Sequence, residues 1–294
     1  MRCLVTGGAG FIGSNLALEF EQKGHEVIVV DNFSTGYMDN IKGFNGRVIN
    51  ADVSKPFEIK DKLDVIFHQA AITNPRYLND EELMRQNING FKLMIKLAKK
   101  HKAKLIYASS ASLYGNGPAP QKEDQKKDLM SAYARSKLMM DEMAERYFDK
   151  MHIVGLRYFN VFGPREAKKG RPASMIYHLT KQMKAGKRPR IFKMGEQKRD
   201  HIYVKDCVLA TIKALDCKSG VYNVGTGVAT SFNELVALIN NVLGTYLKPE
   251  YIDNPYEGTY QNHTQADTTK AEKELGFKAI YTLEQGIKEY VKLI

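Results

Sequence analysis

The sequence predicts an α/β protein with a doubly wound parallel sheet and a smaller lobe in its second half. Short apolar segments alternate with helix-compatible segments over residues 1–110, which is typical of parallel strands joined by helices. A glycine-rich turn separates the first apolar segment from the first helix, and an acid, Asp31, ends the second apolar segment. Together these three features predict a Rossmann-type sheet that binds a dinucleotide.

The composition is that of a globular protein. Of the 294 residues, 43% are hydrophobic and 26% are charged. No apolar run approaches the roughly 20 residues of a membrane span, and the first residues lack the apolar core of a signal peptide. Cys3, Cys207 and Cys217 have no metal-ligand spacing and cannot all pair. We therefore expect a cytoplasmic protein with no membrane segment and no metal site.

The net charge of +11 is consistent with either nucleic acid or a small anionic ligand. The lysines are spread along predicted helices, as at Lys92, Lys96, Lys99 and Lys100. They are not interleaved with aromatic residues in one basic arm. This distribution predicts a phosphate-bearing small substrate and no nucleic-acid partner.

The glycine turn has the spacing Gly7-x-x-Gly10-x-x-Gly13. Gly7 permits a tight turn, Gly10 lets the backbone approach a pyrophosphate, and Gly13 lets the following helix pack closely on the strand. The free amides at the start of that helix, near Phe11 and Ile12, suit two phosphates because the helix dipole adds to them.

Asp31 and Asn32 lie at the end of the second strand. An aspartate there can accept hydrogen bonds from the 2′-hydroxyl of an adenosine ribose, and it would repel a 2′-phosphate. The sequence therefore favours NAD over NADP as cofactor. Lys42 and Arg47 are nearby cations that could permit NADP.

Residues 47–52 read as a third strand, and its final acid, Asp52, could reach the adenine amine. Residues 63–71 read as a fourth strand that runs into small residues such as Ala71, which would let a cofactor lie against the strand ends.

A helix with apolar spacing covers residues 83–97. Asn87 interrupts its apolar face. An asparagine in such a helix is usually solvated, but this side chain could reach back toward the neighbouring strands. His68, at the end of the fourth strand, is expected to be a structural residue beside the cofactor.

The chemistry is predicted where a fifth strand, residues 104–110, ends in Ser110 and a later helix begins with Tyr133-x-x-x-Lys137. Tyrosine and lysine at this spacing lie one helical turn apart. We expect the ammonium to lower the pKa of the phenol, so that the tyrosinate can take a proton from a substrate hydroxyl while hydride leaves its carbon. Lys137 could also bond the nicotinamide ribose, and Ser110 could bond the same substrate oxygen.

Three motifs carry a family resemblance: Thr-Gly-Gly-Ala-Gly-Phe-Ile-Gly at 6–13, Ala-Ser-Ser-Ala-Ser-Leu-Tyr-Gly at 108–115, and Tyr133-x-x-x-Lys137. They resemble the extended short-chain dehydrogenase/reductase family, in its nucleotide-sugar epimerase and dehydratase branch, over essentially the whole chain. The resemblance implies that Ser110, Tyr133 and Lys137 are catalytic. The cofactor residues that we expect are Gly7, Gly10, Phe11, Ile12, Gly13, Asp31, Asn32, Asp52, Ala71, Asn87, Lys137 and Val161.

Two segments in the second half resemble ADP-glyceromanno-heptose 6-epimerases. One is Arg-Glu-x-x-Lys-Gly at 165–170, followed by Ala-Ser and His-Leu, and the other is Tyr-Gln-x-x-Thr-Gln-Ala-Asp at 260–267. In that family the lysine before the glycine is a second acid/base group, which implies Lys169 here. An epimerase has reason to use a second acid/base group. The keto-sugar, or its side chain, rotates between the two hydride transfers, and the hydride then returns to the opposite face. The alternative for Lys168 and Lys169 is a solvated loop pair.

The resemblance also implies substrate contacts and self-association. Phe192 would lie near the nucleotide base, and Arg199 would bind the diphosphate of a nucleotide-diphosphate sugar. Asn160, His178 and Tyr260 are the other substrate candidates. We expect the dinucleotide domain at residues 1–160, with a segment near 200–230 returning to it. The substrate-binding lobe is expected mainly at 161–294, and the protein is expected to form a homo-oligomer.

Three other functions fit parts of the sequence to different degrees. A UDP-hexose 4-epimerase, acting on UDP-glucose or UDP-N-acetylglucosamine, fits the first half equally well, because residues 31–36 look like those of NAD-using 4-epimerases. A 4,6-dehydratase fits less well, since its acidic pair would fall near Ala111 and Ser112. A non-catalytic dinucleotide-binding protein would be expected to lose Tyr133 or Lys137, and both are present.

Overall fold

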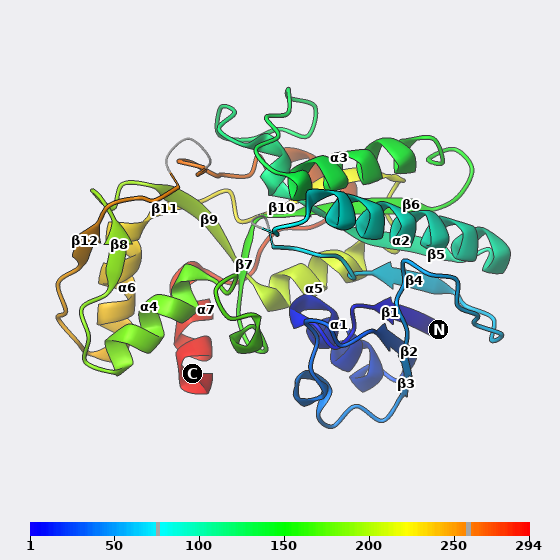
Figure 1. Cartoon of the computed structure of the whole chain (residues 1–294), viewed down its shortest axis with the longest axis horizontal. Coiled ribbons are helices and arrows are strands. Elements are labelled where there is room, and N and C mark those ends of the chain that lie inside the picture. Colours follow the sequence, from blue (N-terminus) through cyan, green and yellow to red (C-terminus); the bar gives the residue numbers. More distant parts are fainter. Residues whose placement is uncertain (75–76, 257–259) are drawn as a thin grey trace.

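The computed structural model describes residues 1–74, 77–256 and 260–294, which form a large parallel sheet between helices and a smaller lobe beside it (Figure 1). All neighbouring strands of the large sheet run parallel. Their order across the sheet is β10 (Gly220–Val224), β6 (Ile153–Tyr158), β5 (Lys104–Ser110), β4 (Val65–His68), β1 (Arg2–Thr6), β2 (Glu26–Asp31) and β3 (Arg47–Asn50). The predicted fold class is confirmed.

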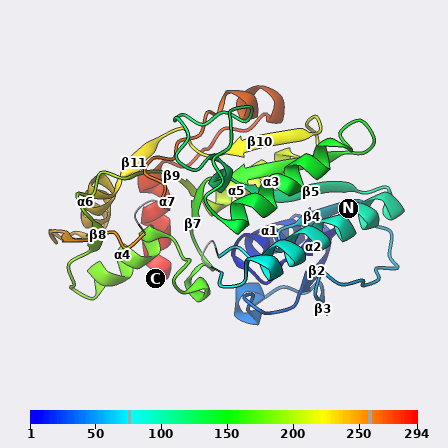
Figure 2. The same ribbon diagram turned by 45° about the horizontal axis from the view of Figure 1, so that its top comes forward.

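Helices cover both faces of this sheet (Figure 2). α1 (Phe11–Gln22) and α5 (Val204–Lys213) pack on one face, and α2 (Asp80–His101) and α3 (Ala132–Glu145) pack on the other. Strand side chains alternate between the two faces. In β1, for example, Val5 packs with α1 and α5, whereas Leu4 packs with α2 and α3.

The smaller lobe has its own apolar core, formed mainly by three helices: α4 (Met175–Lys184), α6 (Phe232–Leu243) and α7 (Leu283–Tyr290). Its strands are β7 (Asn160–Phe162), β8 (Arg190–Phe192), β9 (Lys198–Tyr203), β11 (Ala229–Ser231) and β12 (Glu250–Ile252). The short helices of the chain are η1 (Met38–Ile41), η2 (Ala111–Tyr114), η3 (Ala167–Lys169), η4 (Ala271–Leu275) and η5 (Val291–Leu293).

The chain reverses its direction across the sheet between β1 and β4. From β1 it proceeds through β2 and β3 to one edge, and from β4 through β5 and β6 toward the other. Ligands of doubly wound sheets bind at the carboxyl ends of the strands beside such a reversal. The glycine turn follows β1 at that position, and the predicted catalytic serine ends β5.

The predicted elements agree with the structure in type and differ at their ends. The helix predicted at 83–97 extends to Asp80–His101, because the Asn79 side chain caps it and three acids occupy its first turn. The third strand stops at Asn50, so Asp52 lies in the loop after it.

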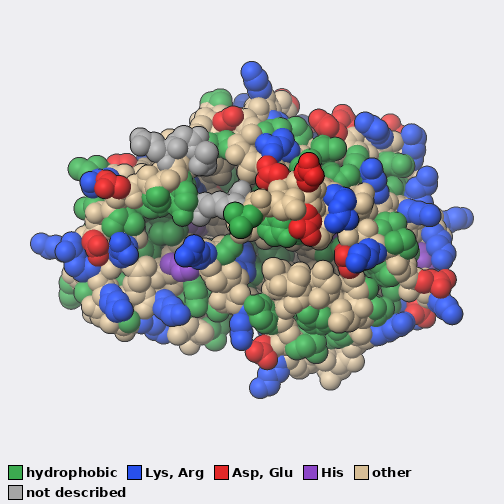
Figure 3. All heavy atoms as spheres, viewed as in Figure 1, with side chains coloured by type: hydrophobic (Ala, Val, Ile, Leu, Met, Phe, Trp, Pro, Cys, Tyr) green, Lys and Arg blue, Asp and Glu red, His purple; other side chains and the backbone are tan. Residues whose placement is uncertain are grey.

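The described residues contain no helix that combines the length and apolarity of a membrane span. On the face drawn in Figure 3, basic side chains are scattered and lie among acidic ones.

Candidate active site

The glycine turn has the geometry that close approach of a dinucleotide requires. Gly7 has φ +66°, in the left-handed region, and its amide donates to the Val30 carbonyl at 2.8 Å. A Cβ on Gly13 would lie 2.1 Å from the Gly7 oxygen, so only glycine fits there. Gly10 caps α1 without any side-chain hydrogen bond, which leaves the first-turn amides, including those of Phe11 and Ile12, for an anion.

Asp31 holds the glycine turn to the end of β2. Its carboxylate accepts the Ala9 amide at 3.0 Å and the Phe33 amide at 2.8 Å, one on each oxygen. Each oxygen keeps further lone pairs that can accept ribose hydroxyls. The side chain is buried, and Gly36 lies against it so closely that a Cβ there would be 2.7 Å from the carboxylate.

One expectation about the cofactor is wrong. Arg47 does not lie beside Asp31, because β3 pairs with β2 so that Arg47 is opposite Ile28 and Asn50 is opposite Asp31. The Arg47 guanidinium instead forms an ion pair with Asp61 at 3.2 Å. It is therefore not placed to accept a 2′-phosphate at the Asp31 end of the strand.

Asn32 and Asp52 form local turns near this site. The exposed Asn32 side chain accepts the Ser34 amide at 3.1 Å. Asp52 accepts the Ser54 amide at 2.9 Å. The pKa of Asp52 is lowered: burial alone would raise it, but the hydrogen bonds to Ser54 and the nearby cations outweigh burial.

Asn87 reaches from α2 to the loop after β4, so of the two alternatives for this side chain it is not the solvated one. It accepts the Ile72 amide at 2.8 Å and donates to the Ile72 carbonyl at 3.1 Å and to Ser136 at 3.1 Å. These bonds fix the loop that contains Ala71, beside the start of α3. His68 is buried, and its Nδ1 shares a hydrogen bond of 2.8 Å with the Thr6 hydroxyl. Burial lowers the pKa of His68 to about 3. It is therefore neutral, as a structural residue would be.

Ser110, Tyr133 and Lys137 come together where β5 and α3 meet. Burial raises the pKa of Tyr133, and a hydrogen bond between Ser110 and the Tyr133 hydroxyl offsets part of that rise. The Lys137 ammonium lies 5.7 Å from the centre of the Tyr133 ring and donates to the Ala108 carbonyl at 2.6 Å. Ser131 caps α3 by accepting the Ala134 amide, so the helix begins just before the tyrosine.

The proton affinities at this site differ from the sequence-based expectation. The pKa of Tyr133 is raised above its ordinary value, not lowered, because desolvation of the phenolate outweighs the other effects in this structure. Burial also lowers the pKa of Lys137 to about 8, although the Asp141 carboxylate opposes the change. Lys137 is 1% exposed.

The sequence reasoning missed an ion pair behind Lys137. Asp141, one turn further along α3, accepts bonds from Tyr107 (2.9 Å), Ser109 (3.0 Å) and the Arg157 guanidinium (2.9 Å), all buried. Its position four residues after Lys137 is the signal that could have revealed it, since such residues share a helix face. The pair links α3 to β5 and β6 directly behind the candidate catalytic residues.

Lys169 comes from a different segment, the end of η3, and lies against the start of α1. Its ammonium is 5.4 Å from the centre of the Phe11 ring. Burial lowers the pKa of Lys169, and the Glu166 carboxylate opposes the change. Lys168 is more exposed and pairs with Asp39 at 3.3 Å, so the solvated-residue alternative describes Lys168 and not Lys169.

Three of the predicted substrate residues form a cluster in the smaller lobe. The Arg199 guanidinium lies 4.8 Å from the centre of the Tyr260 ring, and the Phe192 and Tyr260 rings meet edge to face at 5.3 Å. Arg199 is buried and donates to the carbonyls of Lys198 and Gln261.

A polar cavity of about 460 Å³ adjoins this cluster. Of the residues that line it, only Tyr260 was predicted from the sequence to lie in the site. The lining residues are Asn116, Lys193, Gln197, Asp253, Asn254, Tyr260 and Asn262.

The remaining predicted contacts lie where the two lobes meet and on α4. Asn160 donates to Thr264 at 2.8 Å and to the Asp200 carbonyl at 3.2 Å. Val161 packs against the core of the large sheet and against that of the smaller lobe. His178 is partly buried on α4, beside Tyr177.

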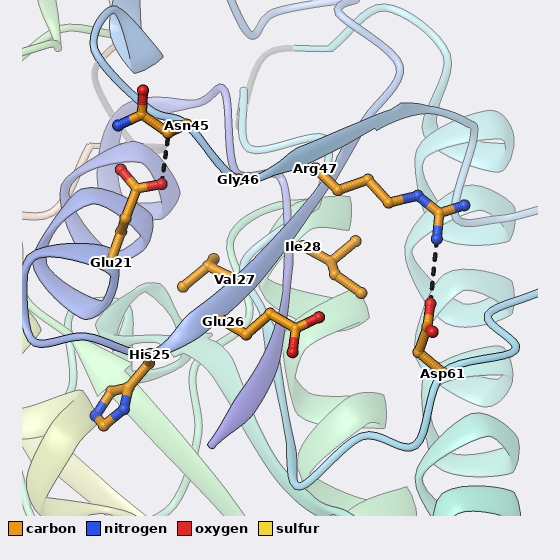
Figure 4. Close-up of a pocket in the computed structure, with 9 residues that line it drawn as sticks. All are labelled: Glu21, His25, Glu26, Val27, Ile28, Asn45, Gly46, Arg47 and Asp61. Carbon is orange, nitrogen blue, oxygen red and sulfur yellow. Dashed lines mark hydrogen bonds and ion pairs between the residues drawn. The ribbon is translucent and has the colours of Figure 1, made fainter.

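A second cavity of about 180 Å³ lies at the amino ends of β2 and β3, away from the glycine turn (Figure 4). Its charged groups have partners: Arg47 pairs with Asp61, and Glu21 accepts the Asn45 amide. Among the described residues, no three His, Cys, Asp or Glu side chains are grouped to hold a metal ion.

Comparison with known proteins identifies the family. The model of the NAD dependent epimerase/dehydratase family matches residues 3–225, which is most of the chain. The chain belongs to this family. It is therefore an NAD-dependent enzyme, and the glycine turn and Asp31 described above fit that cofactor.

Relatives of this NAD-dependent epimerase/dehydratase cover nearly all of it. It is 36% identical to the ADP-L-glycero-D-manno-heptose-6-epimerase of Brachyspira hyodysenteriae, over 99% of this chain and 97% of the relative. The crystal structure of the Helicobacter pylori ADP-L-glycero-D-manno-heptose-6-epimerase is 41% identical, with a TM-score of 0.94 over 99% of this chain and 95% of that one. A UDP-N-acetylglucosamine 4-epimerase from Methanobrevibacter ruminantium is 30% identical, with a TM-score of 0.92 over 99% of this chain and 97% of that one.

Proposed function

We propose that the protein is an ADP-L-glycero-D-manno-heptose 6-epimerase, which inverts carbon 6 of a nucleotide-diphosphate sugar by oxidation to a keto-sugar and re-reduction on the opposite face. The observation that carries this choice is the loop at residues 165–170. Its sequence resembles that of heptose epimerases, and it presents Lys169 beside the helix that begins at the glycine turn. Relatives that bear this name are also more similar to the chain than the 4-epimerase described above.

Tyr133 is the first acid/base group in this proposal. NAD⁺ held at the glycine turn would supply the hydride acceptor, and its positive charge would favour the Tyr133 phenolate. The Tyr133 phenolate accepts the proton of the substrate hydroxyl as hydride leaves the same carbon. Ser110 donates a hydrogen bond to that oxygen, and Lys137 stabilises the phenolate through its charge.

Lys169 is the second acid/base group. After rotation about the bond between carbons 5 and 6, the keto oxygen faces a different part of the site, and a second group must return its proton. Because burial lowers the pKa of Lys169, its ammonium gives up a proton more readily than an exposed lysine would. Lys169 then donates to the oxygen while hydride returns to the opposite face.

The substrate nucleotide is assigned to the smaller lobe. The Arg199 guanidinium, close to Tyr260, has the planar geometry that suits two diphosphate oxygens. Phe192 offers an aromatic surface for the base. Asn160 lies on β7, which pairs with the β9 strand of Arg199, and His178 lies on α4, which shares an apolar core with Tyr260. The polar cavity next to Tyr260 provides further hydrogen-bonding groups.

A substrate panel tests the function. The purified protein is incubated with each epimer of ADP-glycero-manno-heptose, with UDP-glucose and with UDP-N-acetylglucosamine, and the sugars are separated by chromatography. We expect the two heptose epimers to interconvert and the UDP-sugars to remain unchanged. Conversion of a UDP-hexose without conversion of the heptose would establish the alternative, a UDP-hexose 4-epimerase.

We also propose that the protein acts in the cytoplasm as a homo-oligomer without nucleic acid. The three cysteines are free, which suits a reducing compartment. Light scattering of the purified protein gives the number of chains directly, and a mass equal to one chain would contradict the oligomer.

A further inference from the structure

One buried carboxylate joins the two ends of the loop that carries Lys169. Glu166 is 0% exposed. Its Oε1 accepts the Gly163 amide at 3.0 Å and the Ser174 hydroxyl at 2.8 Å, and its Oε2 accepts the Ser174 amide at 2.6 Å. Loop residues 163–174 therefore begin and end on the same side chain.

The first part of this loop is also fixed to the start of α1. The Arg165 guanidinium donates to the Asn15 side-chain oxygen at 2.7 Å, and the Asn15 amide donates to the Phe11 carbonyl at 2.8 Å and the Pro164 carbonyl at 3.0 Å. Arg165 has φ +74°, which is unfavourable for a residue with a side chain. Such a conformation persists only where surrounding contacts hold it.

The position of Lys169 is set by the contacts that hold this loop. Its amide donates to the Glu166 carbonyl at 2.9 Å, which closes the turn that presents the lysine. Its ammonium lies over Phe11, whereas its neighbour Lys168 is exposed and pairs with Asp39.

We propose that Glu166 is a positioning residue for Lys169: by joining Gly163 to Ser174 it fixes the loop so that the lysine faces the start of α1. The proposal rests on the proposed function, in which Lys169 is the second acid/base group. The Glu166 charge has a second effect, since it opposes the loss of the Lys169 proton that burial favours.

Glu166→Gln tests the proposal because glutamine keeps the shape but replaces one acceptor oxygen by a donor that faces the Ser174 amide. The full-length wild-type and variant proteins are treated with an amine-acetylating reagent, and modification of each lysine is followed by mass spectrometry. We expect Lys169 to react severalfold faster in the variant, since the loop is released and more of the amine is neutral. Lys168 serves as an internal control and should change less than twofold. Equal Lys169 rates in both proteins would overturn the proposal.

Kinetics separate positioning from a purely structural role. For Glu166→Gln we expect kcat to fall about tenfold with KM nearly unchanged, because a displaced acid/base group affects the transition state more than binding. Asp206→Asn is a matched control: Asp206 is equally buried and accepts the amides of Ile280 (3.0 Å) and Tyr281 (3.2 Å), away from Lys169. It should lower the melting temperature without changing kcat. An unchanged kcat in Glu166→Gln would overturn the proposal.

Ser174→Ala is a milder second variant, for use where Glu166→Gln does not fold. It removes the hydroxyl bond to the carboxylate and the cap that accepts the Tyr177 amide at the start of α4, but it keeps the Ser174 amide bond to Glu166, so Lys169 acetylation should rise by a smaller factor. An unchanged rate would again contradict the proposal. The acetylation experiment needs no substrate, so it remains decisive if the protein fails to act on ADP-heptose, which would contradict the proposed function alone.

Discussion

Tyr133 and Lys137 show that burial can outweigh a neighbouring charge. Their spacing predicts a phenol made more acidic by an ammonium, yet desolvation raises the pKa of Tyr133 and lowers that of Lys137 to about 8. Both shifts have one cause, which is that each charged form loses its water. The side-chain identities were predictable from the sequence, but burial depends on how β5, α3 and the loops pack together.

The lowered pKa of Lys137 predicts how stability changes with pH. The folded-state pKa is about 8 and the ordinary value is 10.5, so between these values the unfolded chain binds more protons. Stability contributed at this site should therefore rise with pH, by at most about 1.4 kcal/mol per pH unit.

Thermal unfolding of the wild type and of Lys137→Met between pH 7.5 and 10, a range that spans the shifted pKa of about 8, isolates this contribution. The free energy of unfolding of the wild type should increase relative to that of the variant across this range. A difference that stays constant with pH would show that Lys137 titrates at its ordinary value.

At the scale of elements, the alternation of strands and helices and the glycine turn could be read from the sequence. The five strands predicted before Tyr133 are all present, and Lys104–Ser110 has the predicted bounds. The spacing of glycines predicts a close approach because only backbone geometry is involved. The register of the strands could not be predicted in the same way. The sequence suggests that Arg47 lies near Asp31, but the pairing of β2 with β3 places Arg47 opposite Ile28.

The contact between the glycine turn and α1 predicts a large effect of Gly13→Ala. Its Cβ would meet the Gly7 backbone at 2.1 Å, so either α1 or the turn must move. We expect a loss of about 3 kcal/mol in unfolding free energy and weaker NAD binding, measured by chemical denaturation and calorimetry. Gly90→Ala is the control, since its Cβ would be 3.4 Å from the nearest atom, in the middle of α2. Equal effects of the two substitutions would contradict this account.

The Asp141–Arg157 pair predicts a second effect at this scale. Asp141→Asn leaves the buried guanidinium without its counter-charge, which costs about 3 kcal/mol or more. Asp80→Asn removes the exposed pair with Arg135 and should cost under about 1 kcal/mol. Denaturant midpoints measure both, and a similar small effect at Asp141 would show that the buried pair contributes little.

At the scale of the whole molecule, the site draws on segments far apart in the sequence. The glycine turn, Ser110 and the Tyr133 helix belong to the large sheet and its helices, whereas Arg199 and Tyr260 come from the smaller lobe. Local motifs identified these residues one at a time. The polar cavity and the partners of Asp141 on β5 and β6 could not be predicted, because each requires knowing which distant segments pack together. The Glu166 contacts are local, to Gly163 and Ser174, but they depend on how the loop between them folds back on itself. The roles of the individual site residues remain predictions.

The most direct test of the central claim is the epimerisation rate of Tyr133→Phe on ADP-glycero-manno-heptose. The substitution removes the hydroxyl that exchanges the proton, and we expect the rate to fall about 1,000-fold, within the usual range for a general acid/base group. Tyr147→Phe, at a tyrosine that follows α3, should keep the wild-type rate. A folded Tyr133→Phe protein with a wild-type rate would contradict the assignment of Tyr133 as the acid/base group.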